Sequence, residues 1–342
     1  MIRIDGTYGE GGGQIIRTAI ALAAITGEEV EIEDIRANRP NPGLSAQHLH
    51  AVKAVAKLSG GRTEGLELRS TRLKFAPGVL NGFEGDIDIG TAGSITLLLQ
   101  CLIPVAVFAD SETKVRIRGG TDVKWSPPMD FYTELFLKAI REMGCGVHLD
   151  LKRRGYYPKG DGLVEAKITP SHPLKGFVLV EAESERTGER EGVVKGISHS
   201  CGLPAHVAER QAKAAESVLT ENGYDAEIKT EIENGGGRTT GCGITLWKGY
   251  KSGSALGERG KRAERVGEEA AGNIIKELAS ASTVDVYLAD QLIPYIALAN
   301  GKSEMMVRGV TKHLETNMYV TKKFLDVEFE IEKKSGFFAI RR

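Results

Sequence analysis

Three segments of the chain share one pattern, and the spacing between them constrains the fold more than any other feature. In each segment an apolar helix-like stretch leads through a polar turn into a short alternating strand, which closes on an arginine shortly before another helix. The closing arginines are Arg36, Arg118 and Arg308, so the two intervals are 82 and 190 positions, and the second is longer by 108 residues. That excess is the size of one small domain. The pattern predicts three homologous α/β units with an insertion before the core of the third, the alternative being chance similarity among ordinary α/β connections.

Hydrophobic periodicity outside the insertion favours the same arrangement. It predicts helices over residues 12–26, 44–59, 93–108, 129–143 and 312–325. It predicts strands over residues 28–35, 63–75, 84–89, 113–119, 162–168 and 327–333. The last of these strands alternates apolar and acidic residues, which is typical of a sheet with one face packed on helices. The predicted fold class is therefore α/β (α+β).

The predicted insertion has α/β content of its own. We expect strands near 192–198, 224–231 and 242–248, helices over 204–221 and 262–278, and a glycine-rich loop over 233–237. The chain is too long for one compact core, so we predict three regions. They are units one and two of a large domain (1–181), an inserted small α/β domain (182–279) and a third unit that completes the large domain (280–342).

Bulk composition excludes several classes of protein. The 342 residues are 41% hydrophobic and 27% charged, as in ordinary soluble globular proteins. The net charge of −1 means that any nucleic-acid contact must come from a local basic surface. No apolar run approaches the ~20 residues of a membrane span, and the N-terminus has no signal-peptide pattern, so we expect a cytoplasmic protein without membrane contact. The four cysteines lack metal-ligand spacing, which disfavours a zinc site.

A glycine run at residues 9–13 precedes an apolar helix that carries Arg17 one turn in. Exposed backbone amides at a helix N-terminus form an anion site, although such a run is also typical of a tight turn. Glu10 lies inside the run. A carboxylate in this position either holds a divalent cation that bridges phosphates or is a solvent-exposed turn residue.

A second anion candidate is the proline-braced loop that carries Arg36 and Arg39. Arginine forks match phosphate oxygens, and a rigid basic loop favours oxyanion binding over the alternative of a solvated surface loop. Ser45 or a neighbour caps the helix that follows, and Gln47 and His48 lie in its first turns.

Three further sites carry side chains that can hold a nucleoside. Gln100 lies in a long apolar helix, where it either satisfies core backbone groups or reads a base edge. Residues 125–131 begin a helix and offer apolar planes for stacking an adenine, or form a plain proline helix start. Tyr287, Asp290 and Gln291 lie at a strand-to-helix junction, where they can stack on a base and hydrogen-bond a purine edge or ribose.

His313 begins the last long helix, in the polar block of residues 311–317. A histidine can act as a covalent nucleophile toward phosphorus through one ring nitrogen if the other is held by a hydrogen bond. The alternative is a structural or solvated side chain.

Together these residues resemble the RNA 3′-terminal phosphate cyclase family over nearly the whole chain. The motifs that carry the resemblance occur in order at residues 5–6, 9–14, 36–48, 119–122, 155–160, 257–260, 287–291 and 311–317. One departure is Asp161, where the family pattern leads us to expect glycine.

The resemblance implies three units similar to the C-terminal domain of bacterial translation initiation factor three, with a smaller inserted domain. It implies a ligase-class reaction with ATP, a divalent metal (Mg²⁺ or Mn²⁺) and RNA 3′-phosphate ends. The histidine attacks the α-phosphorus of ATP, AMP passes to the RNA 3′-phosphate, and the 2′-hydroxyl then closes a 2′,3′-cyclic phosphate and releases AMP.

By motif position, the resemblance also assigns roles to individual residues. His313 is the nucleophile and Glu10 the metal ligand. The nucleotide-binding residues are Gln100, Pro127, Tyr287, Leu288, Ala289, Asp290 and Gln291. The residues of the phosphate and RNA-end site are Arg17, Arg36, Arg39, Gln47 and His48.

Two other functions compete with this one. A non-catalytic, cyclase-like ribosome-biogenesis scaffold shares the architecture but lacks the nucleophilic histidine. A small-molecule transferase on similar repeats, such as an enolpyruvyl transferase, binds two anionic metabolites without one. His313, Glu10 and residues 287–291 favour the enzyme. An oligomer is compatible with the sequence, which does not specify one.

Overall fold

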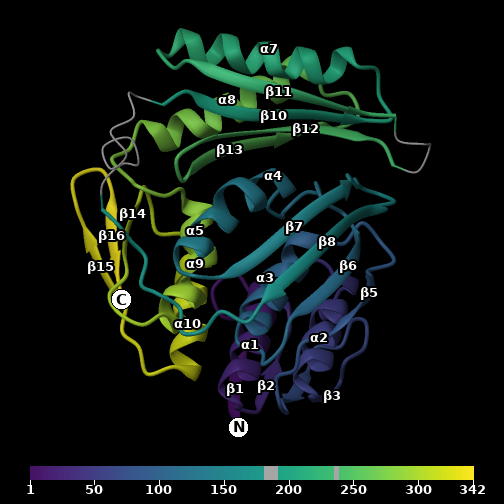
Figure 1. Cartoon of the computed structure of the whole chain (residues 1–342), viewed down its shortest axis with the longest axis vertical. Coiled ribbons are helices and arrows are strands. Elements are labelled where there is room, and N and C mark those ends of the chain that lie inside the picture. The colour runs from purple at the N-terminus through teal and green to yellow at the C-terminus, as the bar shows by residue number, and fades with distance from the viewer. Residues whose placement is uncertain (181–191, 235–238) are drawn as a thin grey trace.

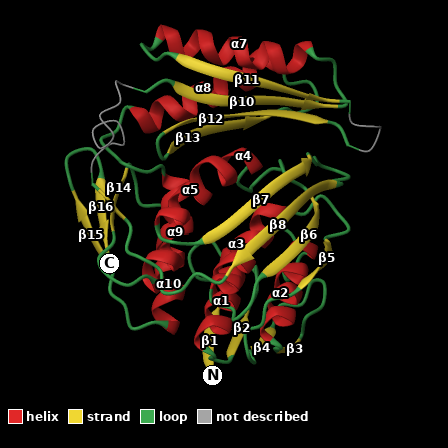
Figure 2. Cartoon of the chain, viewed as in Figure 1, coloured by secondary structure: helices red, strands yellow, loops and turns green. Residues whose placement is uncertain are grey.

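The computed structural model describes residues 1–180, 192–234 and 239–342. Within these residues the chain forms mixed four-stranded sheets whose helices pack between and against them (Figures 1 and 2). The predicted α/β class is confirmed. No helix in this part of the chain combines the length and the apolar character needed to cross a bilayer.

The first sheet follows the N-terminus. Its strands, in spatial order, are β1 (Ile2–Asp5), β2 (Val30–Glu33), β4 (Leu73–Ala76) and β3 (Arg62–Glu64). The helices of this unit are α1 (Gly13–Thr26) and α2 (Ala46–Ser59).

The second sheet has the order β5 (Glu84–Asp88), β6 (Thr113–Gly119), β8 (Gly162–Thr169) and β7 (Gly146–Arg153). Helix α3 (Ile95–Val107) connects its two parallel strands. The connection from β6 to β7 is helical, with α4 (Met129–Phe131), a π-helical segment (Tyr132–Phe136) and α5 (Leu137–Glu142).

The third sheet combines a strand before the predicted insertion with strands after it. Its order is β9 (Val178–Leu179), β14 (Glu304–Val307), β16 (Phe338–Arg341) and β15 (Glu330–Lys333). Its helices are α9 (Val286–Leu298) and α10 (Lys312–Phe324). In all three sheets the first two strands in this order are parallel and the others antiparallel, so the three have one topology. Similarity of each unit to the initiation-factor domain stays a prediction.

The fourth sheet lies between β9 and α9 in sequence and at one end of the molecule in space (Figure 1). Its order is β11 (Ala226–Glu233), β10 (Val194–Cys201), β12 (Gly241–Lys248) and β13 (Lys251–Leu256). Helices α7 (His206–Glu221) and α8 (Ala263–Leu278) pack against each other and against this sheet. Its apolar core runs from Val194 to Ile274 and is distinct from the core shared by the other three sheets.

The shared core owes its continuity to helices that are apolar on nearly every side. Helices α1, α3 and α9 occupy equivalent positions in the three units and bury most of their residues. A helix buried all round must be surrounded by protein, so these helices lie between the sheets rather than on the surface. By contrast, α7 and α8 bury one stripe only, which suits helices that cover one sheet.

Several predicted boundaries differ from the structure for local reasons. The strand predicted over 63–75 is two antiparallel strands, β3 and β4, because the chain turns back through left-handed residues at Gly65 and Arg69. The strand predicted over 28–35 ends at Glu33, since Asp34 and Arg36 have positive φ. The strand predicted over 327–333 begins only at Glu330. Strands β7, β9, β13 and β16 were not predicted.

The division into 1–181, 182–279 and 280–342 stays a prediction. Its first boundary falls in 181–191, and most of the loop predicted over 233–237 falls in 235–238, both outside the described residues.

The packing of α7 on α8 yields a matched pair of glycine substitutions within one helix. A Cβ on Gly267 would lie 2.1 Å from the Gln211 carbonyl oxygen of α7, whereas a Cβ on Gly272 meets nothing within 4 Å. We predict that Gly267→Ala costs about 1–3 kcal/mol of stability through overpacking. Gly272→Ala should be neutral or stabilising by up to ~1 kcal/mol through helix propensity. Thermal unfolding of both variants checks this, and equal unfolding midpoints would contradict the packing.

Candidate active site

His313 lies in the first turn of α10, and its side chain is 46% exposed. The Thr311 hydroxyl caps the helix by accepting a hydrogen bond from the Leu314 amide at 3.0 Å. This cap fixes the helix start, from which the imidazole reaches the N-terminal glycine run. Its Nε2 lies 3.1 Å from Oε2 of Glu10. The structure therefore brings together two predicted residues that are 303 positions apart.

Glu10 also accepts a hydrogen bond from Nη2 of Arg39 at 3.2 Å. Partial burial acts to raise the pKa of Glu10, but His313 and Arg39 outweigh it, so this pKa is lowered. The glycine run is further held to α10 by Tyr8, whose ring stacks on Tyr319 with centroids 3.7 Å apart. The carboxylate is thus ionised and lies between a cation and the imidazole.

The start of α10 is fastened to α1 and α9 by three hydrogen bonds. Gln14 donates through Nε2 to the His313 carbonyl at 2.8 Å. The Thr18 hydroxyl donates to Oδ1 of Asn317 at 2.7 Å, and Asn317 donates to the Asp290 carbonyl at 2.6 Å. We assigned no role to Gln14, Thr18 or Asn317 from the sequence. Gln14 and Asn317 lie within the glycine and histidine motifs, which was the available signal; Thr18 had none.

Arg17, in α1, is buried, and no carboxylate among the described residues forms an ion pair with it. Only 7% of the residue is exposed, and Nε donates to Oε1 of Gln100 at 2.8 Å. In the described part of the chain its terminal nitrogens have no hydrogen-bond partner. Burial lowers the pKa of Arg17 to about 10, which leaves it charged at neutral pH. Burial and then Asp285 raise the pKa of Asp290, against the effect of nearby Arg17. A charged guanidinium without a carboxylate partner attracts an anionic ligand.

The N-terminus of α9 presents an aromatic ring to solvent. Asp285 caps the helix by accepting from the amides of Tyr287 and Leu288 at 3.0 and 2.7 Å. Tyr287 is 64% exposed, whereas Leu288 and Ala289 are buried in the core and only their backbone is near the helix start. Gln291 donates to the Tyr287 carbonyl at 3.2 Å, and its buried Oε1 has no partner among the described residues.

Pro127 lies beside the start of α3. Its carbonyl accepts from the Thr96 hydroxyl at 2.8 Å, one helical turn before Gln100. Trp125, two residues earlier, is 95% exposed with a φ of 62°. The helix start predicted here is therefore present, and it leaves an aromatic ring free.

Residues of the proline-braced loop and of the helix after it have different roles, some structural and one at the site. Arg36 donates to the Gly43 carbonyl within the loop at 2.8 Å, and Gln47 accepts from the Ser94 amide at 3.0 Å. Arg39 is the member of this loop that contacts Glu10. The structure thus places Arg39 beside Glu10, the carboxylate that also contacts His313, while Arg36 and Gln47 hold the loop and the neighbouring unit in position.

His48 is buried under the glycine run rather than exposed beside it. Its Nδ1 lies 3.2 Å from the Ser45 amide and 3.0 Å from the Ser45 hydroxyl, which completes a capping box on α2. A Cβ on Gly13 would lie 1.9 Å from His48 Nε2, so this position requires glycine. Burial lowers the pKa of His48 well below its usual value, and Arg17 and Arg36 act in the same direction. His48 is therefore neutral and cannot serve as a phosphate-binding cation.

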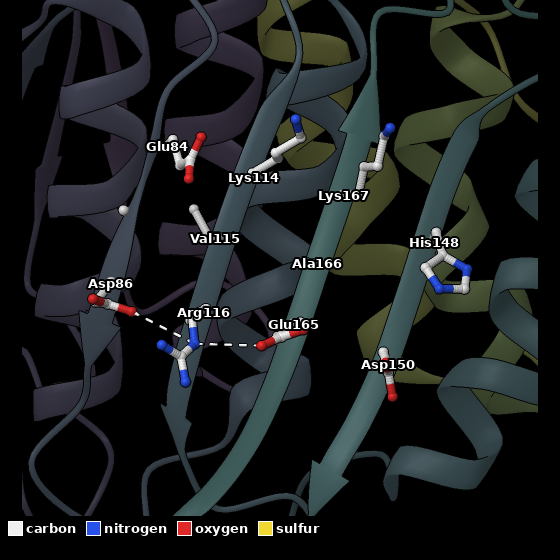
Figure 3. Close-up of a pocket in the computed structure, with 11 residues that line it drawn as sticks. Glu84, Asp86, Lys114, Val115, Arg116, His148, Asp150, Glu165, Ala166 and Lys167 are labelled. Atoms are coloured by element: carbon white, nitrogen blue, oxygen red, sulfur yellow. Dashed lines mark ion pairs between the residues drawn. The ribbon is translucent and has the colours of Figure 1, made fainter.

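A hollow of about 500 Å³ lies elsewhere, on the exposed face of the second sheet (Figure 3). Acidic and basic side chains alternate along it, and Arg116 lies between Asp86 and Glu165, with N···O distances of 4.0 and 3.4 Å. Four carboxylates and three basic side chains line it, and it contains none of the predicted site residues, so we do not assign the nucleotide to it.

Comparison with known proteins identifies the family of the chain. A family model described as RNA 3′-terminal phosphate cyclase matches residues 8–331. The chain belongs to the RNA 3′-terminal phosphate cyclase family. Relatives named RNA 3′-terminal phosphate cyclase include proteins from Methanosarcina mazei, with 49% identity covering 99% of both chains, and Archaeoglobus fulgidus, with 49% identity covering 97% of this chain and 99% of the relative. A third, from Pyrococcus furiosus, is 48% identical over 98% of this chain and 96% of its own length.

The neutral, buried state of His48 predicts a specific pH dependence in this member of the cyclase family. Its pKa is lowered on folding, so its contribution to stability is complete above the unfolded value of ~6.5 and is lost as pH falls below it. Between pH 7.5 and 5.5 the free energy of unfolding should fall by about 1 kcal/mol more in wild type than in His48→Asn, which keeps the cap acceptor. Chemical denaturation at both pH values measures this. His148→Asn, at an exposed histidine, is the control, and an unchanged pH response in His48→Asn would contradict the assignment.

Proposed function

We propose that the protein converts an RNA 3′-terminal phosphate to a 2′,3′-cyclic phosphodiester at the expense of ATP, with His313 as the nucleophile. The observation that carries the proposal is the position of this imidazole. It is half-exposed, 3.1 Å from Glu10, at the glycine run that starts α1. Arg17, buried one turn into α1, provides uncompensated positive charge nearby.

In the first step a nitrogen of His313 with a free lone pair forms a bond to the α-phosphorus of ATP, and the bond to the β-phosphate oxygen breaks. Pyrophosphate leaves, and the histidine carries AMP. Backbone amides at the N-terminus of α1 and the Arg17 guanidinium are suited to offset the charge on the phosphates.

In the second step an oxygen of the RNA 3′-phosphate attacks the same phosphorus, which breaks the phosphorus–nitrogen bond and frees His313. In the third, the neighbouring 2′-hydroxyl loses its proton and attacks the RNA phosphorus, and AMP leaves. Ring closure is intramolecular, so it has a high effective concentration. DNA lacks the 2′-hydroxyl and should not react. Arg39 is the candidate to hold the RNA end, while Arg36, Gln47 and neutral His48 support its loop.

The adenosine is assigned to the residues around the starts of α9 and α3. The exposed ring of Tyr287 can stack on the base. The unpartnered oxygen of Gln291 can accept a hydrogen bond from ligand, and Asp290, whose pKa is raised, can donate as well as accept one. Gln100 and Pro127 complete the group through α3, and Leu288 and Ala289 hold the helix in the core.

We assign the divalent cation to the carboxylate of Glu10. Its exposed carboxylate suits a hard ion such as Mg²⁺ or Mn²⁺ that takes its other ligands from phosphates and water. When bound, the ion would offset charge on the phosphates.

Labelled ATP tests the nucleophile directly. Incubation with ATP labelled at the α-phosphate should give an acid-labile protein–AMP adduct in wild type. His313→Ala should give none, and its cyclisation rate should fall by at least ~10³-fold because a covalent route is lost. His148→Ala, on the face of the second sheet, is the control. If wild type forms no adduct and leaves RNA ends unchanged, the proposed activity is wrong, and a non-catalytic scaffold or a small-molecule transferase takes its place. If RNA ends convert without ATP, or in His313→Ala, the proposed mechanism is wrong.

Tyr287 tests the nucleotide assignment separately. Base stacking on an aromatic ring contributes about 1–3 kcal/mol, so Tyr287→Ala should weaken ATP binding by roughly 5- to 150-fold. Tyr287→Phe keeps the ring and should bind ATP nearly as wild type does. Calorimetric titration with ATP and with a 3′-phosphorylated RNA measures both ligands. Equal losses for ATP and RNA in Tyr287→Ala would contradict the stacking role.

A further inference from the structure

A buried polar cluster joins the fourth sheet to the second unit and uses none of the residues assigned to ATP or RNA. Asp122 follows β6, Asp130 lies in α4, and His199 lies in β10. Each is at most 3% exposed. On β10 the Ser198 hydroxyl donates to the Ala208 carbonyl of α7, so the next side chain, His199, points to the opposite face of the sheet, toward α4.

One atom of each residue faces the other two without a hydrogen-bond partner in the described part of the chain. These atoms are Asp122 Oδ1, Asp130 Oδ2 and His199 Nε2. The nitrogen lies 3.6 Å from the first oxygen and 3.8 Å from the second, and all three atoms lie within 4.8 Å of one another. The distances exceed the ~2.7–3.2 Å of a hydrogen bond. They match neighbouring ligands of an ion whose bonds are about 2.0–2.2 Å long.

The opposite end of each side chain is held by a second set of contacts. Arg154 donates to Asp122 Oδ2 at 3.3 Å and to Asp130 Oδ1 at 2.8 Å. The Tyr156 hydroxyl lies 2.6 Å from His199 Nδ1. With Nδ1–H donating to the phenolic oxygen, the Nε2 lone pair faces the two carboxylates. Partners of this kind fix the orientation of metal ligands.

The charges of the cluster are unequal without a cation. Asp122, Asp130 and Glu231 all pair with one guanidinium, that of Arg154, which lies 2.7 Å from Glu231. Glu231 is half-exposed, so the buried part of the cluster holds two carboxyl groups and one guanidinium. Uncompensated buried negative charge is costly, and a bound cation would offset it.

We propose that Asp122, Asp130 and His199 form a structural site for a first-row divalent transition metal, which joins the fourth sheet to the second unit. An imidazole with two carboxylates suits Zn²⁺, Mn²⁺ or Co²⁺ better than Mg²⁺, which prefers oxygen ligands alone. The site is separate from the cation assigned to Glu10 and requires no nucleotide.

The test uses the full chain without a polyhistidine tag, in the Glu10→Gln background, so that the proposed catalytic ion does not contribute. After treatment with a chelator, titration with Co²⁺ without ATP should give one tight site per chain, with visible absorption from the bound ion and a raised unfolding midpoint. Competition with Zn²⁺ should remove the absorption. Absence of tight Co²⁺, Zn²⁺ and Mn²⁺ binding would overturn the proposal, whether or not the enzyme acts on RNA.

Four variants, one of them a control, locate the ion. Tyr156→Phe removes only a partner of a ligand, and it should weaken Co²⁺ binding by about 10- to 100-fold. His199→Gln and Asp130→Asn each remove a ligand, and the loss of Co²⁺ affinity should be larger. Asp130→Asn keeps the shape of the side chain, so it serves if His199→Gln does not fold, and circular dichroism verifies the fold of each. His148→Gln, at an exposed histidine, should bind as the parent does. Tight binding that survives both ligand substitutions would place the ion elsewhere and refute the site.

Discussion

The packing of α1 against α10 is the constraint on which the proposed active site depends. The Thr18 hydroxyl and the Asn317 amide are buried at this contact, and Asn317 also donates to the Asp290 carbonyl of α9. A buried hydrogen bond that loses one partner leaves the other unsatisfied. This series of hydrogen bonds therefore opposes small displacements of either helix. Because Gln14 donates to the His313 carbonyl on the same contact, the position of the imidazole follows from the packing rather than from its own exposed side chain.

The charges of the site are arranged so that a chain of net charge −1 would accommodate the polyanionic ligands of the proposed reaction. Positive charge is buried at Arg17, next to the amides of a helix start, and is not balanced by a paired carboxylate. Negative charge at Glu10 lies at the exposed edge, where Arg39 and His313 hold it. A neutral His48 keeps further charge out of the interior. Attraction of an anionic ligand would come from this local charge, because the net charge of the chain provides none.

The helices could be predicted from the sequence more accurately than the strands. Residues within motifs could be singled out, whereas most contacts between distant residues could not. Helix 12–26 appears as Gly13–Thr26 because a long apolar run with a glycine at its end leaves little choice. Strand β7 carries polar and charged residues on its exposed face, β16 has only four residues, and half of β13 is serine and glycine, so they give a weak apolar signal. The motifs led us to expect His313 and Glu10 in one site, and the two side chains are in contact, but no periodicity relates Thr18 to Asn317. The burial of His48 depended on an approach to Gly13 that only three-dimensional packing reveals.

The third sheet has a consequence for how the protein is made. Its first strand, β9, precedes the fourth sheet in the chain, and its partner β14 follows it. During synthesis the first two units can fold as they emerge, but β9 lacks its neighbour until more than a hundred further residues have been added. At roughly 5–20 residues per second that interval is on the order of ten seconds. His313 is translated later still, so the proposed nucleophile joins the glycine run only after nearly the whole chain has been made.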